Sequence, residues 1–250
     1  MKKQKIIGII PARYGSSRFY GKVLAEIAGK PMIQWVYEHA KSSVILDDLF
    51  VAVDDVRVLE YVQGFGGKAI MTKPDHESGT DRIAEAVENI DADIVVNIQG
   101  DQPIFDSIMI DEAVAPMLED TSIKMSTLKT EICKEDYADP DVVKVVVDEK
   151  DFALYFSRSL IPYSRDKTEI KVYEHVGLYA YRKNFLLIIS KLPQTYLEKL
   201  EMLEQLRVLE KGYKIKVVET KCDRISCISV DTKEDLFKVE RLIKENILDK

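Results

Sequence analysis

A loop rich in glycine and serine near the start of the chain could bind a triphosphate. It runs from Pro11 to Lys22 and follows the apolar run Ile6–Ile10, which predicts a buried first strand. Small residues let backbone N–H groups approach an anion, and cationic side chains neutralise its charge. Three such side chains lie within ten positions: Arg13, Arg18 and Lys22. The spacing matches neither the P-loop nor the dinucleotide-binding glycine motif, so the loop is a candidate phosphate site of another kind; three solvated surface cations are the alternative.

Two aspartates could hold a divalent cation beside such a triphosphate. Asp101 lies at the carboxyl end of the apolar run Ile94–Ile98, and Asp231 precedes the last predicted helix, Lys233–Asn246. Attack at an α-phosphorus requires neutralisation of anionic charge, normally by a divalent cation together with basic side chains. Mg²⁺ prefers oxygen ligands and keeps several waters, so one or two carboxylates suffice. For Asp231, the alternative is a role as N-cap of the following helix.

Further along the chain, one predicted strand has a polar face that could line a pocket. Side chains alternate with period two, so the face that carries His175 and Tyr179 also carries Tyr173, Gly177 and Tyr181. The opposite face is apolar and is expected to pack in the core. Nearby, Arg158 is a good partner for a carboxylate, because a guanidinium can bind one with two parallel hydrogen bonds.

A carboxylate on a predicted helix, Tyr196–Glu210, is a further candidate. At 100° per residue, Glu204 falls among Leu197, Leu200 and Val208, and other leucines form a second apolar stripe. Burial of an unpaired carboxylate is costly, so Glu204 is expected to meet either a ligand or a buried arginine. Elsewhere, the pair Asp54-Asp55 is read as a helix start, where carboxylates are favoured.

The loop of residues 11–22 and seven further segments resemble the 3-deoxy-manno-octulosonate cytidylyltransferases, also called CMP-Kdo synthetases. The segments run through the whole chain in the order found in that family. They are GKPMI (29–33), SGTDR (78–82), VVNIQGD (95–101), ALYFSR (153–158), HVGLY (175–179), LEQLR (203–207) and VDT (230–232).

The resemblance implies roles for individual residues. Asp101 and Asp231 are expected to bind Mg²⁺ and, with Arg13 and Lys22, to act in catalysis. The residues expected to bind CTP are Arg13, Ser16, Ser17, Arg18, Lys22, Lys73, Ser78, Gly79, Thr80 and Gln99. Those expected to bind an acidic eight-carbon sugar are Arg158, His175, Tyr179, Glu204 and Gln205. The preference for cytosine over uracil rests on the resemblance alone.

Strand-like and helical segments alternate through the first half of the chain. This pattern predicts an α/β fold with a doubly wound, mostly parallel, Rossmann-like sheet and ligands at the strand carboxyl ends. Two extended runs, Val142–Val147 and Phe152–Phe156, are too close in sequence for a crossover and predict a hairpin. We therefore expect one nucleotidyltransferase domain, 1–250, with an inserted antiparallel lobe at about 125–185 for sugar binding and dimerisation.

Composition narrows the possible partners. The chain has 250 residues, 46% of them hydrophobic and 32% charged, with a formal net charge of −7. A negative balance argues against a nucleic-acid partner, which requires a clustered basic surface. The apolar runs are shorter than a membrane span or a signal peptide requires, so no membrane contact and a cytoplasmic location are expected. The three cysteines lack the paired spacing of a metal site, and we expect thiols.

The expected reaction transfers the cytidylyl group of CTP to a 3-deoxy-manno-octulosonate, for lipopolysaccharide biosynthesis in a homodimeric enzyme. Gln102 and Ser229 depart from the commonest family pattern and are similar to a subgroup that activates the 8-amino-3,8-dideoxy sugar. A neuraminate-type acid is a further alternative substrate. A catalytically silent nucleotide-binding protein is the alternative from another class.

Overall fold

The computed structural model describes residues 3–15, 19–166 and 168–248. The chain divides into two compact units. The first combines Met1–Asp111 with Cys222–Lys250, and the second is Glu112–Lys221. The predicted lobe at 125–185 falls inside the second unit, which begins earlier and ends later than predicted.

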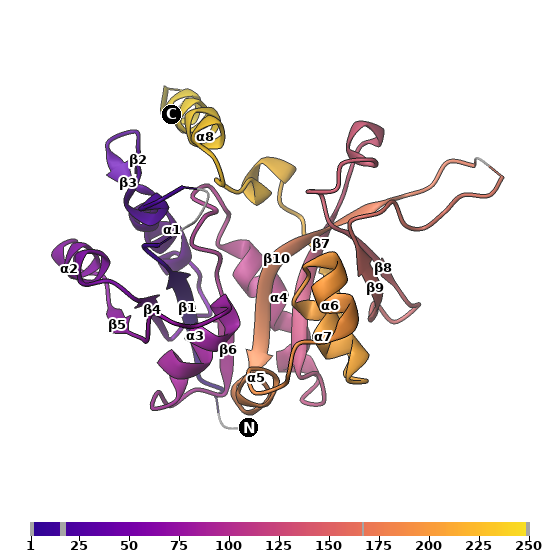
Figure 1. Cartoon of the computed structure of the whole chain (residues 1–250), viewed down its shortest axis with the longest axis horizontal. Helices are drawn as coiled ribbons and strands as arrows, with labels where there is room; N and C mark the ends of the chain where they lie inside the picture. The colour runs from indigo at the N-terminus through magenta and orange to yellow at the C-terminus, as the bar shows by residue number, and fades with distance from the viewer. Residues whose placement is uncertain (1–2, 16–18, 167, 249–250) are drawn as a thin grey trace. The chain divides into compact units, whose positions relative to one another are not determined.

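The first unit contains a parallel sheet whose strand order creates a ligand site. Its strands, in spatial order, are β6 (Ile94–Asn97), β1 (Ile6–Ala12), β4 (Asp48–Val53) and β5 (Ala69–Met71). From β1 the chain proceeds outward through β4 to β5, and β6 then pairs with the other side of β1 (Figure 1). The crevice at the carboxyl ends of β1 and β6 is thus a topological switch point, where α/β sheets bind ligands.

Helices connect these strands, as the alternation predicts. They are α1 (Met32–Lys41), α2 (Val56–Gly64) and α3 (Gly79–Val87), while α4 (Ile108–Glu119) follows β6. Ser78 caps α3, since its hydroxyl accepts the Asp81 N–H and the Asp81 carboxylate accepts the Ser78 N–H. The mixed α/β architecture with a mostly parallel sheet is confirmed.

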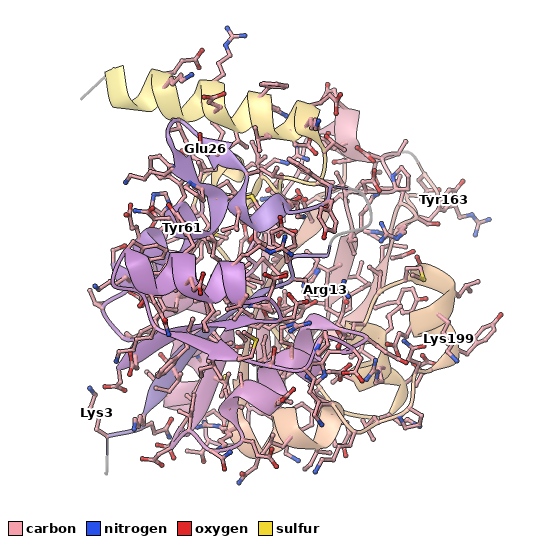
Figure 2. All side chains as sticks on the ribbon, turned by 60° about the vertical axis from the view of Figure 1, so that its left-hand side comes forward. Lys3, Arg13, Glu26, Tyr61, Tyr163 and Lys199 are labelled. Carbon is pink, nitrogen blue, oxygen red and sulfur yellow. The ribbon has the colours of Figure 1, made fainter. Side chains whose placement is uncertain are left out.

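The carboxyl-terminal segment returns to the first unit. Helix α8 (Lys233–Leu248) packs near the short strands β2 (Glu26–Ile27) and β3 (Lys30–Pro31), and Figure 2 shows Glu26 beside it. Their shared core consists of Ile27, Met32, Val230, Val239 and Ile243. This packing fixes the segment that carries Asp231.

The second unit is largely antiparallel. Strand β10 (Tyr173–Arg182) pairs antiparallel with β7 (Met125–Glu131) and β8 (Lys144–Val147), and β8 pairs antiparallel with β9 (Ala153–Ser157), which confirms the predicted hairpin. Strand β11 (Lys216–Glu219) adds in parallel to β7. The helices are α5 (Lys183–Ile189), α6 (Tyr196–Glu201) and α7 (Gln205–Glu210).

The prediction of one continuous helix over Tyr196–Glu210 is wrong. Helix α6 ends where Met202 adopts a left-handed conformation (φ 54°, ψ 45°), and α7 begins after Glu204. Leu200 is 65% exposed, so it does not form the predicted apolar stripe. A buried ion pair instead joins the two helices, because the guanidinium of Arg207 donates to both carboxylate oxygens of Glu198 at 2.9 and 2.5 Å.

Two other expectations concern the chain as a whole. None of the helices in the described ranges combines the length and the apolar character needed to cross a bilayer. Cys133, Cys222 and Cys227 are all thiols, as expected.

Candidate functional site

A cavity of about 270 Å³ lies at the switch point of the first unit. Arg13 follows β1 at the end opposite Lys3 (Figure 2), and Gln99 and Asp101 follow β6. The described residues that line the cavity are Pro11, Arg13, Lys22, Val23, Ser78, Gly79, Arg82, Gln99, Gly100, Asp101 and Asp231. Seven of the residues predicted for nucleotide or metal binding are among them.

Lys22 bridges the two predicted metal ligands. Its ammonium nitrogen donates to Asp101 Oδ2 at 2.9 Å and to Asp231 Oδ1 at 3.0 Å. The aspartates meet because the Val230 N–H donates to the carbonyl oxygen of Asp101 at 2.8 Å. Burial opposes the charge on Lys22, but the two carboxylates outweigh it and raise the pKa of the ammonium above its usual value.

The alternative reading of Asp231, as the cap of α8, is wrong. Thr232 and Asp235 form that cap: the hydroxyl of Thr232 accepts the Asp235 N–H at 3.1 Å, and the Asp235 carboxylate accepts the Thr232 N–H at 2.9 Å. Asp231 therefore directs its carboxylate toward Lys22.

This arrangement suits a hard divalent cation. Two carboxylates converge on one cationic group, and the ammonium of Lys22 stands where such a cation would bind. Among the residues that the structure describes, no group of three or more His, Cys, Asp or Glu side chains is placed so that it could hold a metal ion. Mg²⁺ at this point would complete its coordination with water and phosphate oxygens, as it commonly does.

The backbone of the cavity wall is closely packed. A Cβ atom at Gly100 would lie 2.8 Å from the carbonyl oxygen of Pro11, so only glycine fits there. Among the other predicted nucleotide residues, Lys73 is exposed and Thr80 is buried, and neither lines the cavity. Ser16, Ser17 and Arg18 lie outside the described residues.

The second unit brings most of the predicted sugar residues together. The rings of His175 and Tyr179 lie 5.3 Å apart, and the amide nitrogen of Gln205 lies 3.5 Å from His175 Nδ1. Burial is the main cause that raises the pKa of Tyr179, and the negative charge of nearby Glu204 adds to it. Glu204 sits at the start of α7 and is half-buried, not enclosed in a helix face as predicted.

The hydroxyl of Thr127 stabilises the part of β10 that carries His175 and Tyr179. Between Val176 and Tyr179 the pairing of β10 with β7 shifts, so that Gly177 and Leu178 are extra residues. The hydroxyl of Thr127 donates to the carbonyl oxygens of Val176 at 3.1 Å and Leu178 at 2.8 Å. Sequence reasoning missed Thr127, because its importance depends on a bulge in a strand far along the chain.

The same hydroxyl defines the protonation of His175. It lies 3.0 Å from Nε2, and because its single proton goes to the carbonyl oxygens, it accepts from Nε2–H. Nδ1 then accepts from Gln205. Burial lowers the pKa of His175 to about 3, so the imidazole is neutral at physiological pH.

Arg158 is engaged with the backbone. Its guanidinium donates to the carbonyl oxygens of Glu201 and Pro140, each at 2.8 Å. The carboxylate of Glu201 in turn accepts from Ser157 and from the Arg158 N–H. These bonds use Nε–H and one N–H of Nη1, so a carboxylate ligand would bind through the other N–H groups of the guanidinium.

Sequence reasoning also missed the role of Asp54. The structure confirms a helix start only for Asp55, whose carboxylate accepts the Arg57 N–H at the beginning of α2. Asp54 instead pairs with Arg82, which lines the cavity. The adjacent acidic pair was the only signal available in the sequence.

Comparison with known proteins gives a consistent result. Residues 7–215 match the family model described as cytidylyltransferase. The chain is 51% identical, over 96% of its length and 99% of the relative's, to a 3-deoxy-manno-octulosonate cytidylyltransferase of Geotalea daltonii. It is 52% identical to one of Syntrophotalea carbinolica, over 94% and 97% of the two chains.

Comparison with solved structures gives the same family. A CMP:2-keto-3-deoxy-manno-octonic acid synthetase complexed with CTP has a TM-score of 0.93 and 45% identity, and the match covers 97% of this chain and 99% of the other. A 4-diphosphocytidyl-2C-methyl-D-erythritol synthase of Anaerococcus prevotii has 13% identity and a TM-score of 0.64, covering 97% and 100%, and shares the fold alone. The chain therefore belongs to the cytidylyltransferase family and, within it, to the 3-deoxy-manno-octulosonate cytidylyltransferases.

Proposed function

We propose that this chain transfers the cytidylyl group of CTP to a 3-deoxy-manno-octulosonate, which yields the CMP-sugar and pyrophosphate for lipopolysaccharide biosynthesis. The observation that carries the proposal is the cavity at the switch point, where Arg13, Lys22 and two aspartates meet. A cationic and acidic group at the carboxyl ends of parallel strands suits a metal-bound nucleoside triphosphate.

In the proposed reaction, the anomeric hydroxyl of the sugar gives up its proton to solvent, and its oxygen forms a bond to the α-phosphorus while the bond between that phosphorus and pyrophosphate breaks. Arg13 and Lys22 neutralise the triphosphate, and Lys22 exchanges its carboxylate partners for phosphate oxygens. Asp101 and Asp231 would hold Mg²⁺, which when bound stabilises negative charge on the reacting phosphate. Ser78, Gly79 and Gln99 would line the nucleotide.

The sugar is assigned to the second unit. His175, Tyr179, Glu204 and Gln205 provide hydrogen-bonding groups for hydroxyls, and Arg158 is the proposed partner of the sugar carboxylate. The neutral imidazole and the phenol suit uncharged hydroxyl groups, because neither adds a charge to the site. The family resemblance also supports a cytoplasmic homodimer, which sedimentation and cell fractionation test.

The identity of the substituent at C8 is the remaining question about the substrate. Gln102, which departs from the common pattern, is buried and donates to the carbonyl oxygen of Cys227 at 3.3 Å. A comparison of kcat/KM for the 8-hydroxy and 8-amino sugars decides between them. The similarity of Gln102 and Ser229 to the amino-sugar subgroup is the reason to include the second substrate.

The test of function measures pyrophosphate release by the purified protein with CTP, Mg²⁺ and each sugar in turn. We expect release with at least one octulosonate and none with a nine-carbon neuraminate-type acid. Absence of release with every octulosonate would contradict the proposal. If calorimetry then showed CTP binding, the protein would be a silent nucleotide-binding member of the family.

A further inference from the structure

One buried carboxylate links the phosphate-binding loop to helix α3. Asp54 immediately follows β4, and its side chain is 10% exposed. Its Oδ1 atom accepts the Tyr14 N–H at 2.9 Å, and its Oδ2 atom accepts from Arg82 Nη2 at 3.2 Å. Asp54 does not line the cavity, but both of its partners belong to segments that do.

The backbone of Tyr14 connects the loop to Asp54 and also closes the loop on itself. Its N–H is held by Asp54, and its carbonyl oxygen accepts the Gly21 N–H at 3.0 Å. Gly21 has φ +71°, a conformation that favours glycine. Arg13 and Lys22 are the neighbours of these two residues in the chain, so the position of both cations depends on this closure.

Arg82 extends the connection to a third segment. Its side chain is 1% exposed, and Nη1 donates to Thr72 Oγ1 at 2.6 Å and to the carbonyl oxygen of Lys73 at 3.2 Å. Residues 73–80 include Lys73, Ser78, Gly79 and Thr80, which the resemblance assigns to CTP binding. The guanidinium therefore fixes the start of that stretch relative to the loop.

Asp54 compensates the charge of the buried Arg82 guanidinium. Burial is the main cause that lowers the pKa of Arg82, and the positive charge of Arg13 adds to this, whereas Asp54 opposes it. Removal of one partner from a buried pair leaves the other charge uncompensated. Without the Asp54 carboxylate, Arg82 would lose its charge partner and the Tyr14 N–H would lose its acceptor.

We propose that Asp54 is a positioning residue for CTP: through Tyr14 and Arg82 it sets the spacing between the triphosphate loop and the segment that begins at Thr72. The inference rests on the proposed function, since it assumes that CTP occupies the cavity. Asp54 itself does not contact the nucleotide. Its effect is on the affinity for CTP.

The test compares Asp54→Asn with Asp48→Asn. The asparagine at 54 is close in shape but cannot neutralise Arg82. Asp48 lies at the other end of β4 and pairs with Lys68, away from the cavity. We expect Asp54→Asn to raise the KM and the calorimetric Kd for CTP at least tenfold, with the KM for the sugar unchanged, and Asp48→Asn to change neither. Asp54→Glu, which keeps the charge, should restore part of the affinity.

Several outcomes separate this inference from the proposed function. CTP affinity within twofold of wild type in Asp54→Asn overturns the inference, whatever the turnover. If Asp54→Asn does not fold, Arg82→Lys replaces it, because lysine keeps the charge but lacks the guanidinium fork; unchanged CTP affinity there also overturns the inference. A wild type that binds CTP but transfers it to no sugar contradicts the proposed function and leaves the calorimetric comparison valid.

Discussion

Lys22 neutralises two carboxylates that would otherwise repel each other. Asp101 and Asp231 come from distant parts of the chain, and both accept from the same ammonium. Like charges held close together disfavour ionisation, so a cation between them is a condition for this arrangement. A divalent cation bound by the two aspartates would compete with the ammonium for that position.

The competition predicts that Lys22→Met binds a divalent cation in the absence of nucleotide. We expect Mn²⁺, measured by electron paramagnetic resonance, to bind this variant at least tenfold more tightly than wild type, since about 1.4 kcal/mol of lost competition corresponds to that factor. Arg13→Met is the matched control. It also removes one cation from the cavity wall, but its Mn²⁺ affinity should stay near that of wild type. Equal affinities in wild type and Lys22→Met would contradict the prediction.

The carboxylates themselves are expected to be required for turnover. Asp101→Asn should lower kcat by at least about 100-fold, because metal neutralisation of a reacting phosphate contributes several kcal/mol. Asp106→Asn is the control: Asp106 is exposed and accepts the Ile108 N–H, which asparagine can also do. Turnover near the wild-type rate in a folded Asp101→Asn would remove the metal assignment.

For single residues, the sequence could suggest a role where residue type and position next to a predicted strand are enough to suggest it. Asp101 follows a buried strand, and its placement needs only that strand. Asp54 could not be assigned, because its partners Tyr14 and Arg82 are brought to it by the folding of two other elements. Asp54 and Asp55 can be told apart only by the hydrogen bonds that each of them makes in the folded chain.

At the level of elements, the break between α6 and α7 changes how Glu204 is presented. Leucine spacing predicted one amphipathic helix, since periodicity records which residues are apolar and not where the backbone turns. The left-handed conformation of Met202 ends α6 and places Glu204 at the beginning of α7. Non-glycine residues adopt this conformation rarely, so no methionine pattern signals it.

Met202 should tolerate replacement by glycine better than by a branched residue. Met202 is 76% exposed, so little packing is lost. Because left-handed backbone costs an L-residue about 1–2 kcal/mol and glycine almost nothing, Met202→Gly should increase the free energy of unfolding by up to about 1 kcal/mol, after the extra flexibility of glycine in the unfolded chain is subtracted.

Urea unfolding measures this difference, with Met202→Val as the comparison. Valine should lower the free energy of unfolding, because a β-branched side chain is disfavoured at positive φ. A Met202→Gly variant less stable than Met202→Val would show that the turn is not set by backbone strain.

The bulge in β10 shows the opposite case, in which a sequence pattern holds despite an irregularity. Gly177 and Leu178 are two extra residues relative to β7. An even number preserves the alternation of faces, so His175 and Tyr179 remain on one side, as period two predicted. A single extra residue would have moved Tyr179 to the opposite face.

For the molecule as a whole, the first unit was more predictable than the second. Strands β1, β4 and β6 are continuous apolar runs linked by helices, which is the pattern of a buried parallel sheet. In the second unit, β11 pairs with β7 although most of the unit separates them in the chain. Local periodicity does not specify such a partner, and the compact unit Glu112–Lys221 extends beyond the 125–185 predicted for the lobe.

Global stability should depend on pH through His175. Burial holds the folded-state pKa well below the value near 6.5 of an unfolded histidine. Between these two values the unfolded chain binds a proton that the folded chain does not. The free energy of unfolding therefore falls as the pH drops below about 6.5, by at most about 1.4 kcal/mol per pH unit for this one group.

The contribution is isolated by subtraction of a His175→Gln variant, which keeps a donor for Thr127 and does not titrate. Urea unfolding of both proteins from pH 7.5 to 4.5 is followed by circular dichroism, which reports on the secondary structure of both units, whereas the single tryptophan, Trp35, lies in the first unit. The difference, wild type minus variant, should be constant above pH 7 and should decrease steadily below 6.5. A difference that stays constant down to pH 4.5 would mean that His175 takes up its proton in the folded protein as readily as in the unfolded chain, and that the Thr127–His175–Gln205 hydrogen bonds do not require a neutral ring.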